Sequence, residues 1–170
     1  MTASIDLLLD PSDRDVDQLA VLLVDAVGSG ASVGFLLPLG LDESAGWWGE
    51  ALADPLTETW VARDSDGTIV GCVRLTRAWK PNSSHRGEIS KLLVARRARR
   101  QGLATRLMET AESAAWARGL RLLLLDTETD SPAQAFYAAR GWEVVGVIED
   151  YAATPYGDSA ATTIMSLRRP

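Results

Sequence analysis

The chain has 170 residues, of which 46% are hydrophobic and 24% are charged, and its formal net charge at pH 7 is −6. This composition is typical of one globular domain, residues 1–170, and excludes a disordered chain or a coiled-coil fibre. The single cysteine, Cys72, excludes an intramolecular disulfide framework and a cysteine-rich zinc site. The single histidine, His85, argues against a histidine-based metal site or a Ser-His-Asp triad, so we expect no bound metal.

Location and partners are constrained by the same simple features. No apolar run reaches the roughly 20 residues that a membrane-spanning helix needs. Residues 1–10 carry no basic segment of the kind that begins a secretory signal, so we expect a cytoplasmic protein without a membrane partner. The negative net charge argues against general binding to nucleic acid. A dense arginine cluster over residues 96–100 nevertheless suits a small anionic ligand.

The first half of the chain is predicted to hold one short strand, two helices and a hairpin. Apolar residues at helical spacing mark the first helix, which ends at Gly28-Ser29-Gly30. A glycine-punctuated loop over 30–40 separates it from the second helix. The turn Asp64-Ser65-Asp66-Gly67 predicts a tight hairpin. The predicted elements are a strand over 4–9, helices over 13–27 and 42–53, and strands over 57–63 and 68–79.

The second half alternates between strands and helices. A helical stripe that includes Leu103, Leu107 and Ala111 ends at Gly119, and the four-leucine run after it is short enough to be a buried strand. The predicted elements are strands over 86–95, 122–125, 142–148 and 161–167, and helices over 102–118 and 132–140. The order of elements predicts an α/β domain with a mixed sheet and helices on both faces, including one βαβ unit.

A basic loop joins the strand that ends at Val94 to the helix that begins near Gly102. The first turn of a helix presents unpaired N–H groups and a partial positive charge, which together bind phosphate. Gly102 permits close backbone approach, Ala104 keeps the next turn small, and Arg99 and Arg100 can add charge-assisted hydrogen bonds. The alternative is a solvated arginine run before an ordinary helix, because neither a P-loop nor a dinucleotide-binding glycine pattern is present.

Two stretches of this half carry a family resemblance. The first is Leu92-Leu93-Val94 followed by Arg99-Arg100-Gln101-Gly102-Leu103-Ala104, and the second is Asp130-x-x-Ala133-x-x-Phe136-Tyr137-x-x-x-Gly141-Trp142. In this order they resemble the acetyl-CoA motif and a second motif of the GCN5-related N-acetyltransferase (GNAT) family. The resemblance implies a central mixed sheet flanked by helices, acetyl-CoA as cosubstrate and no metal. The cofactor contacts that it implies come from Leu92, Leu93, Val94, Arg99, Arg100, Gln101, Gly102, Leu103, Ala104, Thr105 and Asp130.

One position departs from the family pattern. The family commonly has asparagine where this sequence has Asp130, and an ionised aspartate accepts hydrogen bonds but donates none. We therefore expect Asp130 to serve mainly as the N-cap of the following helix.

Acetyl transfer to an amine needs a neutral amine, a stabilised thioester oxygen and a proton for the leaving thiolate. Glu88 is a candidate general base, with a solvent-facing strand glutamate as the alternative. Asp126 is the second candidate, with a loop or helix-capping carboxylate as the alternative, and Glu128 is a less favoured third. Tyr137 is the candidate general acid, with a packed core tyrosine as the alternative. Backbone N–H groups around Leu93 would meet the thioester oxygen.

The acceptor is the least constrained part of the prediction. Aromatic side chains could line its pocket, although core packing is the favoured role for each of Trp47, Trp48, Trp79, Tyr151 and Tyr156. Residues 30–35, 126–128 and 152–157 resemble a toxin-resistance member of the family, which favours a small-molecule amine or hydroxyl on an antibiotic or toxin. The alternatives are a protein or peptide amine, or an acyl-CoA-binding regulatory module without turnover. We expect a monomer or a homodimer.

Overall fold

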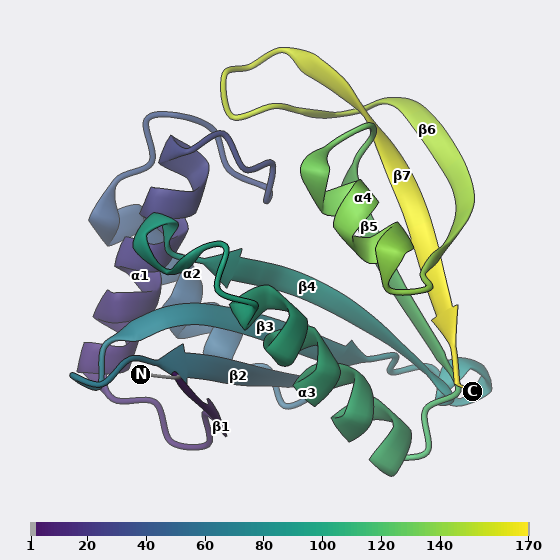
Figure 1. Cartoon of the computed structure of the whole chain (residues 1–170), viewed down its shortest axis with the longest axis horizontal. Coiled ribbons are helices and arrows are strands. Elements are labelled where there is room, and N and C mark those ends of the chain that lie inside the picture. The colour runs from purple at the N-terminus through teal and green to yellow at the C-terminus, as the bar shows by residue number, and fades with distance from the viewer. Residues whose placement is uncertain (1–2, 170) are drawn as a thin grey trace.

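A single seven-stranded sheet organises the chain, and the computed structural model describes residues 3–169 (Figure 1). The strand order is β1-β2-β3-β4-β5-β7-β6. The strands are β1 Ser4–Leu7, β2 Thr57–Arg63, β3 Ile69–Arg77, β4 Arg86–Val94, β5 Leu122–Glu128, β6 Glu143–Ala153 and β7 Ser159–Arg168. The helices are α1 Asp13–Gly28, α2 Leu41–Leu52, α3 Leu103–Ala117 and α4 Pro132–Ala139, with 3₁₀ turns η1 Pro81–Ser83 and η2 Arg96–Ala98. The predicted mixed α/β fold is therefore confirmed.

Helices cover both faces of the sheet, and each face has its own apolar core. Helix α3 packs on β2, β3 and β4 through a buried stripe that includes Leu107, Met108 and Ala111. Helices α1 and α2 form the other core, in which Leu23 and Trp48 are fully buried. Figure 1 shows α4 beside β5 and the β6–β7 hairpin rising beyond it. No helix within residues 3–169 is long and apolar enough to cross a membrane.

The predicted elements are present, with differences at their ends. Strand β5 runs to Glu128 instead of ending at residue 125, because β7 continues to pair with it as far as Thr162 opposite Glu128. Strand β6 likewise extends to Ala153. A polar stretch such as 126–128 carries no apolar alternation to announce a strand, so only its hydrogen-bonding partner defines it.

The predicted βαβ unit creates an opening in the sheet. Strands β4 and β5 are parallel but pair only over Arg86–Glu88 and Leu122–Leu124, and beyond this point they diverge. Gly87 lies at the pairing point, where an added Cβ would come within 2.9 Å of side-chain atoms of Leu75 and Leu120. A glycine is needed here because the α3 core approaches the backbone so closely.

A β-bulge in β4 lies at the edge of this opening. Cys72 pairs with Leu93 and Arg74 pairs with Ser90, so β4 carries one more residue than β3 between the two pairs. Lys91 takes up the extra length with a positive φ of 50°. Bulges bend a strand and re-aim its side chains, which turns the Lys91 side chain out of the regular alternation.

Candidate active site

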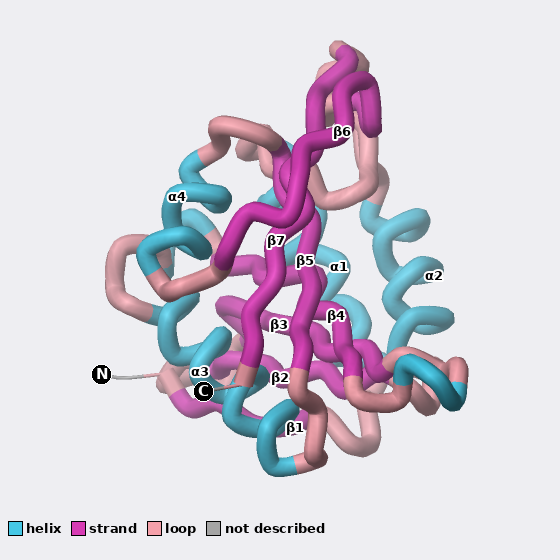
Figure 2. Tube along the Cα trace, turned by 90° about the vertical axis from the view of Figure 1, so that its right-hand side faces the viewer, coloured by secondary structure: helices cyan, strands magenta, loops and turns pink. Residues whose placement is uncertain are grey.

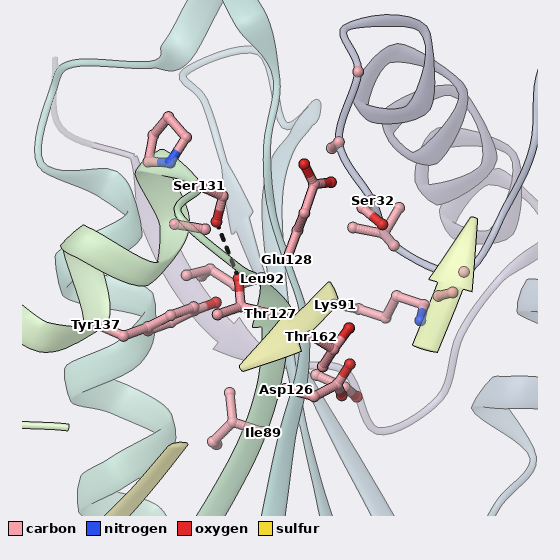
Figure 3. Close-up of a pocket in the computed structure, with 18 of the residues that line it drawn as sticks. Ser32, Ile89, Lys91, Leu92, Asp126, Thr127, Glu128, Ser131, Tyr137 and Thr162 are labelled. Carbon is pink, nitrogen blue, oxygen red and sulfur yellow. Dashed lines mark hydrogen bonds between the residues drawn. The ribbon is translucent and has the colours of Figure 1, made fainter. Parts of the chain in front are cut away.

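The gap between β4 and β5 forms a cleft of about 730 Å³. Its walls come from β4, β5, the start of α4, β6 and the loop that joins α1 to α2 (Figure 3). The lining residues are Ser29–Gly34, Ile89–Leu92, Arg99, Asp126–Glu128, Asp130–Ala133, Tyr137, Tyr151, Ala152 and Thr162. Beyond the pairs that involve Glu88 and Leu124, the edges of β4 and β5 that face each other have no strand partner within the described residues. The cleft therefore offers backbone as well as side-chain groups to a ligand.

The first turn of α3 lies just beyond one end of the cleft, and we call this turn together with Arg99 of the cleft lining the helix end. Gly102 is the N-cap of α3, has a φ of 74° and supplies no side-chain hydrogen bond to the helix. Helices α1 and α4, in contrast, are capped by the side chains of Ser12 and Ser131. An added Cβ at Gly102 would meet no atom within 4 Å, so the space in front of the helix is open. An uncapped helix start with open space before it can receive an anion.

The arginine cluster divides into members with different roles. Arg96 pairs with Asp25 of α1 at 2.6 Å, and Arg97 pairs with Asp64 of the β2–β3 hairpin at 2.9 Å. Arg99 donates to the carbonyl of Val94 at 3.0 Å and to Ser29 Oγ at 2.8 Å, and it lines the cleft. All three arginines are exposed, and Arg99 is the one of them that lines the cleft.

The other predicted cofactor residues surround this end at different depths. Leu92 lines the cleft, whereas Leu93 is buried in the α1 core and Val94 pairs with Gly71. Arg100 and Gln101 are exposed and lie outside the cleft lining. Leu103, the first residue of α3, is buried, and Ala104 and Thr105 of the same turn are half-buried. The structure therefore brings Leu92, Arg99 and Asp130 into the cleft and leaves the α3 turn just beyond it.

Asp130 does not cap α4, so that prediction was wrong. The N-cap is Ser131, whose Oγ accepts a hydrogen bond from the N–H of Gln134. Asp130 instead has a φ of 61°, donates its own N–H to Gln134 Oε1 at 2.6 Å and lines the cleft. The two residues are adjacent and both are good caps, so sequence preference alone could not separate them.

Tyr137 lies on α4, with its hydroxyl directed into the cleft beside Thr127 and Leu92 (Figure 3). Its ring is 9% exposed and makes edge contacts with Phe136 and Trp142. Burial, together with the nearby charge of Asp126, raises the pKa of Tyr137 to about 12. The hydroxyl therefore keeps its proton at neutral pH. It is both a packed tyrosine and a residue of the cleft.

The two candidate bases lie on one face of the sheet. Glu88 pairs with Leu124, and Asp126 lies two residues further along β5. Burial, and then the charge of Asp126, raises the pKa of Glu88 above its usual range. Asp126 and Glu128 line the cleft, whereas Glu88 does not. Asp126 is neither a loop nor a capping carboxylate, because it lies within β5 and pairs with Ile164.

Lys91 is a cleft residue that the sequence did not reveal. Its Nζ lies 5.0 Å from the centre of the Trp47 ring, and burial and the nearby Arg74 lower its pKa. We call Lys91, Ser32 and Asp126 the lysine end of the cleft. The signal in the sequence was the rarity of lysine. Only two of the 17 basic residues are lysines, and Lys91 is one of them.

The aromatic residues are mostly not pocket walls. Trp48 is buried in the α1–α2 core, and Trp79 is 74% exposed. Trp47 supports Lys91, while Tyr156 lies near Gly30. Tyr151 is the one of these five predicted aromatics that lines the cleft. Cys72 is fully buried, and burial raises the pKa of its thiol to about 12. The thiol therefore stays protonated and unreactive, which is typical of a structural cysteine.

The loop between α1 and α2 meets the β6–β7 turn above the lysine end. The N–H of Leu37 donates to the carbonyl of Pro155 at 2.8 Å. Figure 1 shows the tip of the β6–β7 hairpin reaching towards that loop, and Figure 2 shows the same hairpin standing away from the rest of the sheet. The bridge joins the loop and the hairpin, each of which contributes residues to the cleft lining. Within residues 3–169, no cluster of three or more His, Cys, Asp or Glu side chains could hold a metal ion.

Comparisons with known proteins agree with this geometry. Residues 34–142 match the acetyltransferase (GNAT) family. The chain is 31% identical over 130 residues to an uncharacterized N-acetyltransferase encoded in the hisH–hisA intergenic region of Azospirillum brasilense, covering 75% of this chain and 77% of that protein.

Solved structures share the fold at low sequence identity. A phosphinothricin acetyltransferase from Sinorhizobium meliloti, solved with acetyl-CoA, superposes with a TM-score of 0.79 at 20% identity, covering 99% of this chain and 89% of that one. A ribosomal-protein-alanine N-acetyltransferase from Brucella melitensis gives a TM-score of 0.79 at 20% identity, covering 98% and 99%.

Proposed function

This chain belongs to the acetyltransferase (GNAT) family and is an acetyl-CoA-dependent acyltransferase, and from that premise we propose that it acetylates the amine of a small molecule, an antibiotic or toxin. The observation that carries the proposal is the cleft between β4 and β5. It brings a protonated tyrosine, Tyr137, and a carboxylate, Asp126, to one space beside an uncapped helix start.

The helix end fits the pyrophosphate of acetyl-CoA. Gly102 leaves the front of α3 open, and the N–H groups of the first turn have no side-chain cap. Arg99 can add a charge-assisted hydrogen bond from the cleft side, since its guanidinium is fixed by Val94 and Ser29. The unpaired edge of β4 can hydrogen-bond an extended pantetheine arm as a strand would. When bound, acetyl-CoA supplies an activated acetyl group and a thiolate leaving group.

Tyr137 is proposed as the proton donor to the departing sulfur. Its pKa of about 12 lies well above the roughly 8.5 of an ordinary thiol, so full transfer to a solvated thiolate would be uphill. Donation therefore has to accompany cleavage of the C–S bond, in a cleft where water stabilises the thiolate poorly. The packing of the ring between Phe136 and Trp142 holds the hydroxyl in place.

The carboxylates are proposed to receive the proton of the acceptor ammonium. Asp126 lines the cleft and is the direct candidate, while Glu88 can act through a water from the same face. A base whose pKa is raised, as that of Glu88 is, holds an abstracted proton more readily. Backbone N–H groups next to the bulge, around Leu93, are the proposed donors to the thioester oxygen.

A small acceptor is favoured over a protein because the α1–α2 loop and the β6–β7 hairpin, which both line the cleft, are joined by the hydrogen bond between Leu37 and Pro155. Two further likenesses support it. One is to the phosphinothricin acetyltransferase named above. The other is the resemblance of residues 30–35, 126–128 and 152–157 to the tabtoxin resistance protein. A peptide amine remains the alternative acceptor, as in the ribosomal-protein-alanine enzyme that shares the fold.

The test is thiol release from acetyl-CoA against a panel of small amines, aminoglycosides, β-lactam amino acids and short peptides. We expect turnover of at least one small amine and its loss in Tyr137→Phe. Turnover of peptides alone would transfer the assignment to a peptide amine. Binding of acetyl-CoA with no transfer to any amine would support the regulatory module instead.

A further inference from the structure

At the lysine end, the ammonium of Lys91 forms no direct ion pair with a carboxylate of residues 3–169. Within residues 3–169, no carboxylate oxygen lies within 4.0 Å of Lys91 Nζ. Lys91 is nevertheless half-buried and lines the cleft. Asp126 and Glu88 attract the ammonium only from beyond that distance, so an anion that enters the cleft makes a direct contact that the protein itself does not supply.

Arg74 adds a second positive charge beside Lys91, opposed by the more distant charges of Asp126 and Glu88. Arg74 is 8% exposed and lies against the same Trp47 ring, with its guanidinium carbon 5.5 Å from the ring centre. One of its terminal nitrogens donates to the carbonyl of Ala51, but its buried Nε has no partner. Two cations therefore share one aromatic ring. The repulsion between them contributes to the lowered pKa of Lys91.

The direction of Lys91 separates it from the acetyl-transfer position. Figure 3 shows Lys91 extending away from Tyr137, on the side of the cleft where Ser32 also lies. The bulge and the φ of 50° produce this direction, and an added Cβ at Gly34 would lie 4.0 Å from Lys91 Nζ. The α1–α2 loop thus forms the wall opposite the ammonium, with the hydroxyl of Ser32 available as a second donor.

We propose that Lys91 and Ser32 bind an anionic group of the acceptor, so that the substrate is an amine that also carries a carboxylate or a similar oxyanion. This inference rests on the proposed function, since it names the acceptor class of the same cleft. Asp126 faces the acceptor ammonium, and Lys91 faces its anionic group. The two opposite charges fix the orientation of a zwitterion. An aminoglycoside or a polyamine carries no group for Lys91 and is disfavoured.

The test compares matched acceptors that differ only in the anionic group. Amino acids such as L-methionine and L-phenylalanine are assayed beside their carboxamides, with wild-type protein and three variants. Lys91→Met removes the charge, Lys91→Arg keeps it, and Lys80→Met is the matched control. Lys80 is the other lysine of the chain and also lies over a tryptophan, 5.4 Å from the Trp79 ring centre, outside the cleft.

We expect the wild-type enzyme to prefer the acid over the amide by about 10- to 100-fold in kcat/KM, the range of a hydrogen bond to a charged group. Lys91→Met should abolish this preference by raising KM for the acid alone. Lys91→Arg should keep most of it, and Lys80→Met should keep all of it. Equal turnover of acid and amide by the wild type, or equal losses for both acceptors in Lys91→Met, would overturn the proposal.

Two further readouts separate this inference from its premise. The KM for acetyl-CoA should be unchanged in Lys91→Met, and an increase would assign Lys91 to the cosubstrate's phosphates instead. Thermal stabilisation by N-acetyl-L-methionine, compared with its carboxamide, measures anion binding without turnover. It should be present in wild type and absent in Lys91→Met. Its absence in wild type would reject the anion site even if acetyl transfer occurs, whereas its presence with no transfer to any amine would reject only the proposed function.

Discussion

The helix end and the lysine end of the cleft are assembled in different ways. At the helix end, Arg99 and Gly102 lie within one short stretch of chain, and much of the proposed binding comes from backbone N–H groups. At the lysine end, Ser32, Lys91 and Asp126 come from a loop, a bulged strand and a second strand. The first end is local and tolerant of side-chain identity, while the second depends on particular side chains meeting. Substitutions at the helix end should therefore impair function mainly when they disturb the backbone, whereas substitutions at the lysine end should do so whenever they change one of its side chains.

Loss of the tyrosine hydroxyl between the two ends should have the largest effect. In Tyr137→Phe, we expect kcat to fall by about 100- to 1,000-fold, the usual contribution of a general acid. The KM for acetyl-CoA and the thermal stability should change little, since the ring packing against Phe136 and Trp142 is kept. Thiol release and acetyl-CoA binding are measured side by side, and we expect the first to be lost and the second to be retained. A variant that retains near wild-type kcat would remove Tyr137 from the chemistry.

A branched side chain at the N-cap of α3 tests the backbone character of the helix end. Gly102→Val should weaken acetyl-CoA binding by more than about 10-fold, because a branched residue in the left-handed region costs on the order of 1–2 kcal/mol and its bulk fills the open space before the helix. Gly67→Val is the matched control. Gly67 has the same φ of 74° and equally open surroundings, but it lies in the β2–β3 hairpin.

Both variants should lose similar amounts of stability in chemical denaturation. Only Gly102→Val should lose affinity for acetyl-CoA in a direct titration. Equal affinities in the two variants would mean that the start of α3 does not contact the cosubstrate.

The two candidate bases, Glu88 and Asp126, predict a specific pH dependence. Because burial and Asp126 raise the pKa of Glu88, a mechanism that needs ionised Glu88 loses kcat/KM as the pH falls through that raised pKa. Asp126→Asn removes a negative charge, so the pKa of Glu88 should fall and the acid limb should move to lower pH. We expect a loss of about 10-fold at neutral pH from Asp126→Asn, less than the roughly 100-fold or more for a sole general base, because Glu88 is still present to receive the proton. In Glu88→Gln the limb should disappear, and an unchanged limb would exclude Glu88 as the titrating group.

The smallest predicted effect distinguishes two neighbouring arginines. Arg99→Ala should raise the KM for acetyl-CoA by about 5- to 10-fold, since one charge-assisted hydrogen bond is lost at the helix end. Arg97→Ala should leave that KM unchanged, because Arg97 is engaged with Asp64 on the surface. Its loss should lower stability by no more than about 1 kcal/mol. Equal KM values for the two variants would show that the cluster acts only as a diffuse positive patch.

The elements that the sequence predicted well are those with a local signal. The hairpin turn at 64–67 and the glycine that begins α3 follow from residue types that favour one backbone conformation. The position of Tyr137 in the cleft follows from a motif on a single short helix. The predicted capping role of Asp130 failed within such a motif because its neighbour Ser131 is an equally good cap.

The sequence alone determined the order of elements, the βαβ unit and the helix end, because hydrophobic period, turn residues and an uncapped helix start are encoded over a few adjacent residues. Only the tertiary structure decided where β4 and β5 part, that Asp126 lies within a strand, and that Lys91 enters the cleft without a direct ion pair to any residue within 3–169. Strand pairing and burial join residues far apart in the chain. The charge environment of a side chain is therefore fixed by neighbours that sequence spacing does not reveal.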